Sequence, residues 1–178
     1  GMAAVSAAIM HSVKAGDHIV AVDTVYGPTR KLISEYLPRF GISVTYVPGT
    51  DPQQFADALQ PNTRLIYLES PSSLVFELQD LEAVAALARE RGIVTAIDNS
   101  WASPYFQKPA SLGIDLILHS ATKYLGGHSD LVAGVVLGSA ERMRELCAWE
   151  GQLLGGMLDP FAAWLMLRGI RTLPVRLD

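Results

Sequence analysis

The sequence is poor in several features that would each point to a particular class of protein. Its 178 residues include one cysteine, Cys147, so no disulfide can form within the chain, which favours a reducing, cytoplasmic location. Charged residues make up 18% and the net charge is only -4, with no lysine- or arginine-rich block to neutralise nucleic-acid phosphates. No apolar run approaches the roughly 18 residues that span a bilayer. Neither a nucleic acid nor a membrane is therefore an expected partner.

The sequence also lacks the motifs of a nicotinamide-binding site and of a metal site. The first strand-like run, His18–Val22, lacks the Gly-x-Gly-x-x-Gly turn that a nicotinamide-binding sheet carries after its first strand. A nicotinamide-dependent enzyme is therefore set aside. His11 and His18 have no partner histidine or cysteine at ligand spacing, so we expect no metal and place both side chains at the core edge or the surface.

Apolar residues, in contrast, are abundant. They form 49% of the chain, more than a sheet covered on one face requires. This surplus favours a sheet buried on both faces or an extensive subunit interface. The apolar runs of strand length are His18–Val22, Ser43–Val47, Leu65–Leu68, Ile93–Ile97, Ile114–Leu118 and Val132–Leu137.

Segments with helical spacing separate most of these runs. One predicted helix has Asp80 as its N-cap and Gly92 just after its end. Alternation of strands and helices predicts an α/β fold, with a mostly parallel sheet and helices on both faces. Only Ser120–Asp130 separates the last two strand-like runs, which is short for a helical crossover, so the last strand is predicted to be antiparallel. The apolar face of that helix, spaced i, i+3, i+4, i+7, is Leu81, Val84, Ala85 and Ala88.

Chemically active side chains follow two of the strand-like runs. Asp98 closes Ile93–Ile97, while Ser120, Thr122 and Lys123 come just after the run that ends at Leu118. In open α/β sheets, ligands bind at the carboxyl ends of the strands. An amine, a carboxylate and two hydroxyls therefore converge on one ligand, and pyridoxal phosphate (PLP) suits all four: its aldehyde needs a lysine, its ring nitrogen an acid and its phosphate short donors.

Two segments around these residues carry a family resemblance. Residues 97–101, Ile-Asp-Asn-Ser-Trp, and residues 120–130, Ser-Ala-Thr-Lys-Tyr-Leu-Gly-Gly-His-Ser-Asp, closely resemble the signature of the Cys/Met-metabolism PLP-dependent enzymes. This is the trans-sulfuration family, which includes the cystathionine lyases and synthases. The resemblance extends across the whole chain and implies the large domain of a fold type I PLP-dependent transferase.

The resemblance also implies roles for individual residues. Lys123 would bond covalently to PLP, Asp98 would pair with the ring nitrogen, and Tyr26 would stack on the ring. These three are the expected catalytic residues. The phosphate would be received at a helix start, where free amides and the helix dipole favour an anion. The expected cofactor-binding set is Gly1, Met2, Tyr26, Asp98, Ser120, Thr122 and Lys123.

The same resemblance sets an expectation for the domain and the assembly. Residues 1–178 are expected to be the PLP-binding large domain of a longer enzyme, because the N-terminal arm and C-terminal small domain of the family are not in this sequence. Family members act on small amino-acid substrates and form homo-oligomers, so a dimer or homotetramer is expected.

The subgroup is indicated by residues 69–77. Many γ-eliminating members and γ-synthases have asparagine and proline where this chain has Ser73 and Leu74, and this departure, with Trp101, is similar to bacterial cystathionine β-lyases. The expected activity is β-elimination of cystathionine to homocysteine, pyruvate and ammonia in methionine biosynthesis. A cystathionine γ-lyase, a γ-synthase and a methionine γ-lyase stay open, as does a non-catalytic fragment. The role of Ser73 near the cofactor also stays open.

Overall fold

A six-stranded sheet forms the centre of the computed structural model, which describes residues 1–178. The strand order is β2-β1-β3-β4-β5-β6; the first five strands are parallel, and β6 pairs with β5 in the antiparallel direction. The predicted mostly parallel sheet with one antiparallel strand is confirmed. The strands are β1 (His18–Val22), β2 (Ser43–Val47), β3 (Thr63–Glu69), β4 (Val94–Asp98), β5 (Leu116–His119) and β6 (Val135–Leu137).

The last two strands are shorter than their apolar runs. Ile114 donates its amide to Pro109 O at the end of a short helical turn, so β5 begins only at Leu116. Before β6, the amide of Ala133 donates to Thr122 Oγ1, and the carbonyl of Ala133 accepts the amide of Thr122, so neither group pairs with β5. Backbone groups that are already bonded cannot join a sheet ladder, which explains the shorter strands.

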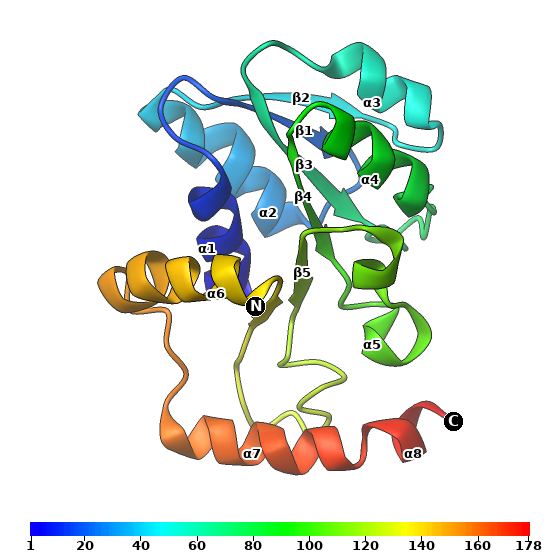
Figure 1. The fold of residues 1–178 in the computed structure, drawn as a ribbon. Helices are drawn as coiled ribbons and strands as arrows, with labels where there is room; N and C mark the ends of the chain where they lie inside the picture. Colours follow the sequence, from blue (N-terminus) through cyan, green and yellow to red (C-terminus); the bar gives the residue numbers. More distant parts are fainter.

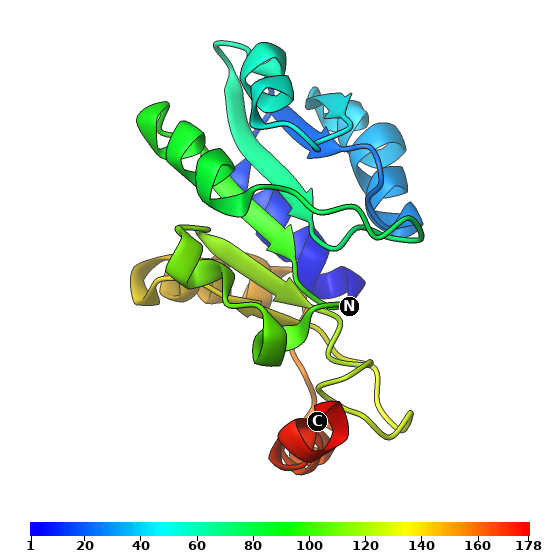
Figure 2. The same cartoon turned by 90° about the vertical axis from the view of Figure 1, so that its right-hand side faces the viewer.

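Helices cover both faces of the sheet (Figures 1 and 2). Helices α1, α2 and α6 lie on one face, and α3 and α4 on the other. Their bounds are α1 (Met2–Ser12), α2 (Gly27–Lys31), α3 (Pro52–Ala58), α4 (Leu81–Glu90), α5 (Ser103–Phe106), α6 (Ala140–Leu146), α7 (Pro160–Arg171) and α8 (Leu173–Leu177). Short 3₁₀ or π turns are η1 (Leu32–Tyr36), η2 (Leu37–Phe40), η3 (Pro109–Leu112) and η4 (Cys147–Gly151).

Helix α4 follows the sequence pattern closely. The Asp80 side chain accepts the amide of Ala83 at 3.0 Å, which caps the first turn, and Gly92 has a positive φ of 65° just after the helix. Its buried residues are the four that the spacing predicted: Leu81, Val84, Ala85 and Ala88. Both faces of the central strands are buried as well, since every residue of β1 and β5 is buried.

The prediction for His18 is wrong, because its side chain is 1% exposed. Its Nδ1 lies 2.8 Å from Thr63 Oγ1 and its Nε2 lies 2.9 Å from Thr45 Oγ1. A histidine flanked by hydroxyls on neighbouring strands has hydrogen-bond partners inside the core, so it need not reach water.

Helix α7 lies across the carboxyl end of the sheet, beside the long connection between β5 and β6 (Figure 1). Leu165 of α7 is buried with Leu125 and Leu131 of that connection in a second apolar cluster. None of the helices combines the length and the apolar character that crossing a bilayer requires.

Candidate active site

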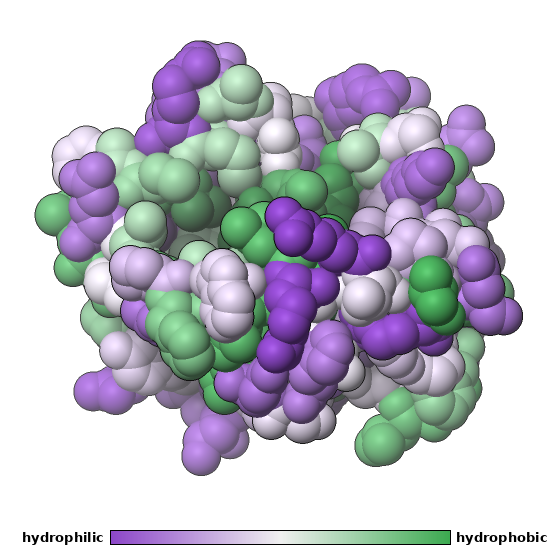
Figure 3. Space-filling model, turned by 90° about the horizontal axis from the view of Figure 1, so that it is seen from below, coloured by the Kyte–Doolittle hydropathy of each residue, from purple (hydrophilic) through white to green (hydrophobic).

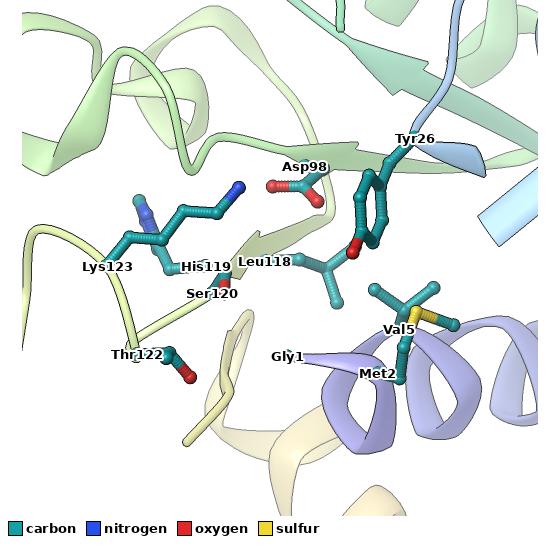
Figure 4. Close-up of a pocket in the computed structure, with 10 residues that line it drawn as sticks. All are labelled: Gly1, Met2, Val5, Tyr26, Asp98, Leu118, His119, Ser120, Thr122 and Lys123. Atoms are coloured by element: carbon teal, nitrogen blue, oxygen red, sulfur yellow. The ribbon is translucent and has the colours of Figure 1, made fainter. Parts of the chain in front are cut away.

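A cavity of about 270 Å³ lies at the carboxyl ends of the strands (Figure 4). The end of β4, the connections after β1 and β5, and the start of α1 all contribute to its wall. The structure therefore brings together every residue of the predicted site. The lining residues are Gly1, Met2, Tyr26, Asp98, Ser120, Thr122 and Lys123, with Val5, Leu118 and His119 as additional wall residues.

Asp98 is held rigidly at the end of β4. It is in register with Glu69 on β3 and Leu118 on β5, so strands on both sides fix its backbone. Its Oδ1 accepts the amide of Ser100 at 2.9 Å. This local turn uses one carboxylate oxygen and leaves the other free to accept a hydrogen bond from a ligand.

The segment that carries Lys123 is anchored on both sides. Thr122 Oγ1 accepts the amide of Ala133 at 2.9 Å and donates to its carbonyl at 3.2 Å. The amide of Ser120 donates to Ser100 Oγ at 2.6 Å, which ties this segment to the turn after Asp98. The lysine backbone is therefore fixed, while its side chain is exposed and free to reach into the cavity.

Lys123, Asp98 and Tyr26 face one another across the cavity. Figure 4 shows the amine of Lys123 pointing toward the carboxylate of Asp98, with the Tyr26 ring beside them. Lys123 Nζ lies 5.6 Å from the centroid of the Tyr26 ring. Lys123 forms no ion pair with Asp98 in this structure, so the amine and the carboxylate are separately available to a ligand.

The start of α1 forms the opposite end of the cavity. Its first amides have no partner within the helix, and they give this end a positive character. The nitrogen of Gly1 donates to Ala133 O at 2.8 Å, and the amide of Met2, in the first turn, has no hydrogen-bond partner within the helix. A Cβ atom on Gly1 would lie 3.1 Å from Ser120 Oγ, which shows how closely the helix start and that hydroxyl approach. Ser120 is therefore a better placed donor than Thr122, whose hydroxyl hydrogen is used by Ala133.

A smaller cavity of about 150 Å³ adjoins the first and shares Tyr26, Asp98 and Lys123 with it. Glu69 and Ser73 line this second cavity, and sequence reasoning did not include them among the site residues. Burial raises the pKa of the Glu69 carboxyl above its ordinary value, against the opposing effect of hydrogen bonds from Ser73 and Tyr26. Glu69 could have been found from its position, since it ends β3 just as Asp98 ends β4.

The backbone after Ser73 has an unusual shape. Leu74 has a φ of 69° and Phe76 a φ of 56°, both in the left-handed region that side chains rarely adopt. Proline is locked near −65°, so it could not replace Leu74 in this conformation. This chain has Ser73 and Leu74 where many relatives are expected to have asparagine and proline. The positive φ of Leu74 is a conformation that proline cannot adopt.

His119 is a further wall residue that the sequence reasoning passed over. Its side chain is buried at the end of β5, and burial lowers its pKa below the usual histidine value, while the charge of Asp98 opposes this shift. The neutral ring is therefore favoured at this wall of the cavity.

A family profile described as "Cys/Met metabolism PLP-dependent enzyme" matches residues 1–178. The chain belongs to this family. The cystathionine gamma-lyase and the cystathionine beta-lyase MetC of Bacillus subtilis are each 41% identical over 178 residues, which is 100% of this chain and 47% and 45% of theirs. The crystal structure of cystathionine gamma-lyase from Lactobacillus plantarum complexed with L-serine superposes with a TM-score of 0.94 and 39% identity, covering 98% of this chain and 46% of that one.

Two facts follow for this member of the Cys/Met-metabolism family. The chain spans about half the length of the relatives it matches. In addition, a β-lyase and a γ-lyase are equally similar to it, so overall identity does not separate the two reactions. The similarity to bacterial β-lyases that residues 69–77 indicated therefore stays a hypothesis about the subgroup.

The family implies PLP as the cofactor, and the donor set of the cavity fits that molecule. A lysine amine, a carboxylate and an aromatic ring surround the space in which a pyridine ring would lie, and a helix start with a nearby hydroxyl lies where a phosphate would. The cavity volume is close to the lower end, about 300 Å³, of pockets that bind small molecules.

Proposed function

We propose that the protein containing this chain is a PLP-dependent carbon–sulfur lyase that splits cystathionine by β-elimination. With one water, the reaction gives homocysteine, pyruvate and ammonia. The observation that carries the proposal is the convergence of the Lys123 amine, the Asp98 carboxylate and the Tyr26 ring on one cavity. The sequence departure at Ser73 and Leu74, and Trp101, support the β-lyase reaction over the γ-reactions.

The chain's own residues would divide the work of holding PLP. Lys123 would hold it covalently through its aldehyde carbon, and Tyr26 would cover one face of the ring. The free oxygen of Asp98 would accept a hydrogen bond from the protonated ring nitrogen. The amide of Met2 and the hydroxyl of Ser120, with Gly1 and Thr122 shaping the same end, would hold the phosphate.

The reaction needs a proton to leave the substrate's Cα and the thiolate to leave its Cβ. When bound, PLP supplies the electron sink that makes the first of these steps possible. Lys123, once released by the incoming amino acid, is the base that lies on the cavity side and can take the Cα proton. Asp98 would keep the ring nitrogen protonated, because a nearby carboxylate favours the charged form of the ring.

We also propose that residues 1–178 are the cofactor-binding large domain and that the protein assembles as a homodimer or homotetramer in the cytoplasm. Helix α7 supports an assembly, because apolar side chains at every third position along it are exposed to solvent. Figure 3 shows apolar surface among polar groups on the side of the molecule where α7 lies. Such patches are typical of interfaces. The exposed side chains are Phe161, Trp164, Leu167 and Ile170.

The products formed from cystathionine test the reaction. A β-lyase releases pyruvate, and a γ-lyase releases 2-oxobutyrate, so the two keto acids can be measured in the same sample by chromatography. We expect pyruvate and homocysteine in equal amounts. Release of 2-oxobutyrate and cysteine instead would show that the γ-reaction is the correct one.

The alternative of a non-catalytic fragment is tested on the chain of 178 residues itself. We expect added PLP to give a visible absorption band that borohydride bleaches, with the label recovered on the peptide containing Lys123. A chain that binds PLP in this way but turns over no amino acid would favour the fragment interpretation for these residues alone.

A further inference from the structure

Glu69 is the most deeply buried carboxylate beside the cavity, with 7% of its surface exposed. Each of its two oxygens has a different partner. Oε2 accepts the backbone amide of Tyr26 at 2.7 Å, and Oε1 accepts the hydroxyl of Ser73. The carboxylate therefore joins the turn after β1 to the loop after β3.

The bond from the Tyr26 amide adds to the bond that the Tyr26 carbonyl accepts from the amide of Arg30 in α2. Tyr26 precedes α2, its side chain is 45% exposed, and its ring hydroxyl makes no hydrogen bond within the chain. The hydrogen bond from its amide to Glu69 ties the Tyr26 backbone to the sheet, and Glu69 is in register with Asp98. Glu69, at the end of the strand next to Asp98, therefore helps to fix the position of the Tyr26 ring at the cavity.

The bond from Ser73 has a chemical consequence. A serine hydroxyl has one hydrogen, and Ser73 gives it to Glu69. An ionised carboxylate only accepts hydrogen bonds, so the direction of this bond is fixed while Glu69 is charged. Toward the cavity, Ser73 can then present only the lone pairs of its oxygen. An asparagine at this position would instead present an amide that donates.

We infer that Glu69 is a positioning residue for the PLP site: by accepting the Tyr26 amide, it fixes the Tyr26 ring over the cofactor. This inference rests on the proposed function. It assigns Glu69 no contact with the substrate or the cofactor, since Glu69 acts through Tyr26.

Two substitutions in the intact protein separate geometry from charge. Glu69→Ala removes both acceptors, whereas Glu69→Gln keeps an acceptor oxygen for the Tyr26 amide and an NH₂ group that can donate to Ser73 Oγ. We expect Glu69→Ala to weaken PLP binding at least about tenfold in an absorbance titration, and Glu69→Gln to stay within about threefold of the unsubstituted protein. Should Glu69→Ala not fold, Glu69→Met, which lacks acceptors but keeps the volume, replaces it.

Glu77 provides the matched control. It is a partly buried glutamate in the same loop, its side chain makes no hydrogen bond, and it lines neither cavity. Glu77→Ala is therefore expected to bind PLP unchanged. PLP binding by Glu69→Ala at the unsubstituted affinity would overturn the inference. So would a Glu69→Gln variant as weak as Glu69→Ala, because the charge rather than the hydrogen-bond geometry would then be responsible.

A second readout needs no cofactor. In the PLP-free protein, the amide of Tyr26 should exchange its hydrogen faster in Glu69→Ala than in Glu69→Gln, and equal rates would contradict the role assigned to Glu69. Borohydride labelling of Lys123 in the unsubstituted protein tests the proposed function separately. Absence of the label refutes the cofactor assignment, and the exchange rates still decide whether Glu69 positions Tyr26.

Discussion

The two ends of the sheet both contain buried polar side chains, but the two clusters differ in what their groups bond. At the amino end, both nitrogens of His18 are bonded, to Thr63 and Thr45, and Gln60 Nε2 lies 3.2 Å from the same ring. At the carboxyl end, Lys123 and one oxygen of Asp98 have no partner within the chain and face a cavity.

This difference teaches that burial of polar groups does not by itself mark a functional site. The amino-end cluster is closed: its groups satisfy one another, which is what a core requires of buried polar atoms. In the carboxyl-end cluster, only Glu69 has both oxygens bonded, by the amide of Tyr26 and the hydroxyl of Ser73. The amine of Lys123 and one oxygen of Asp98 face the cavity without a partner. Chemistry is expected where unsatisfied groups meet a space large enough for a ligand.

The largest expected effect is that of Lys123→Ala at the open end. Removal of the amine takes away the covalent hold on PLP and the base, so turnover should fall by more than about a thousandfold, to the background rate. The unfolding free energy should change little, because the side chain is exposed. Steady-state assay of keto-acid release and a urea titration measure the two quantities. Full turnover in this variant would refute the assignment.

Asp98→Asn should have the next largest effect. An amide cannot hold a proton on the ring nitrogen as a carboxylate does, so turnover is expected to fall on the order of a thousandfold, about 4 kcal/mol of transition-state stabilisation. The Ser100 amide can still donate to the asparagine oxygen, so the turn should persist. A variant with nearly unchanged kcat/KM would show that Asp98 has another role.

At the closed end, His18→Ala should affect stability alone. The substitution removes the imidazole from the buried hydroxyl of Thr63 and the partly buried hydroxyl of Thr45, and such a loss typically costs about 2 kcal/mol. Urea unfolding should report this loss, while the PLP dissociation constant should stay the same. A change in PLP affinity as large as that of a carboxyl-end variant would break the comparison between the two ends.

The smallest expected effect is a pH dependence of stability. Burial lowers the pKa values of His18 and His119, so at acidic pH the unfolded chain binds protons that the folded chain does not. The stability from the neutral rings is therefore present above the unfolded histidine pKa of about 6.5 and is lost as the pH falls toward the folded values. Urea unfolding between about pH 7.5 and 5.5 should show this decrease, with a smaller slope for His18→Gln. An unchanged slope would mean that His18 takes up its proton equally in both states.

Much of the fold and of the site follows from local patterns in the sequence. The spacing of Leu81, Val84, Ala85 and Ala88 gave α4 with its correct buried face, because a helix repeats every 3.6 residues whatever surrounds it. The order of strands and motifs likewise placed Asp98 and Lys123 at strand ends that had to share one edge of a parallel sheet. The mistake at His18 arose because a histidine at the start of an apolar run gives no local sign of its partners, Thr45 and Thr63, which lie on other strands.

By itself, the sequence determined the order of strands and helices, the antiparallel direction of the last strand and the amine and carboxylate that meet at the cavity, because these depend on chain order and short-range periodicity. Only the tertiary structure decided that Glu69 accepts the amide of Tyr26, 43 residues away, and a hydrogen bond from the hydroxyl of Ser73. The pairing of β1 with β3, and the path of the loop after β3, bring these groups within hydrogen-bond distance. Neither feature is written in the spacing of residues along the chain, since both arise from the packing of segments that are distant in sequence.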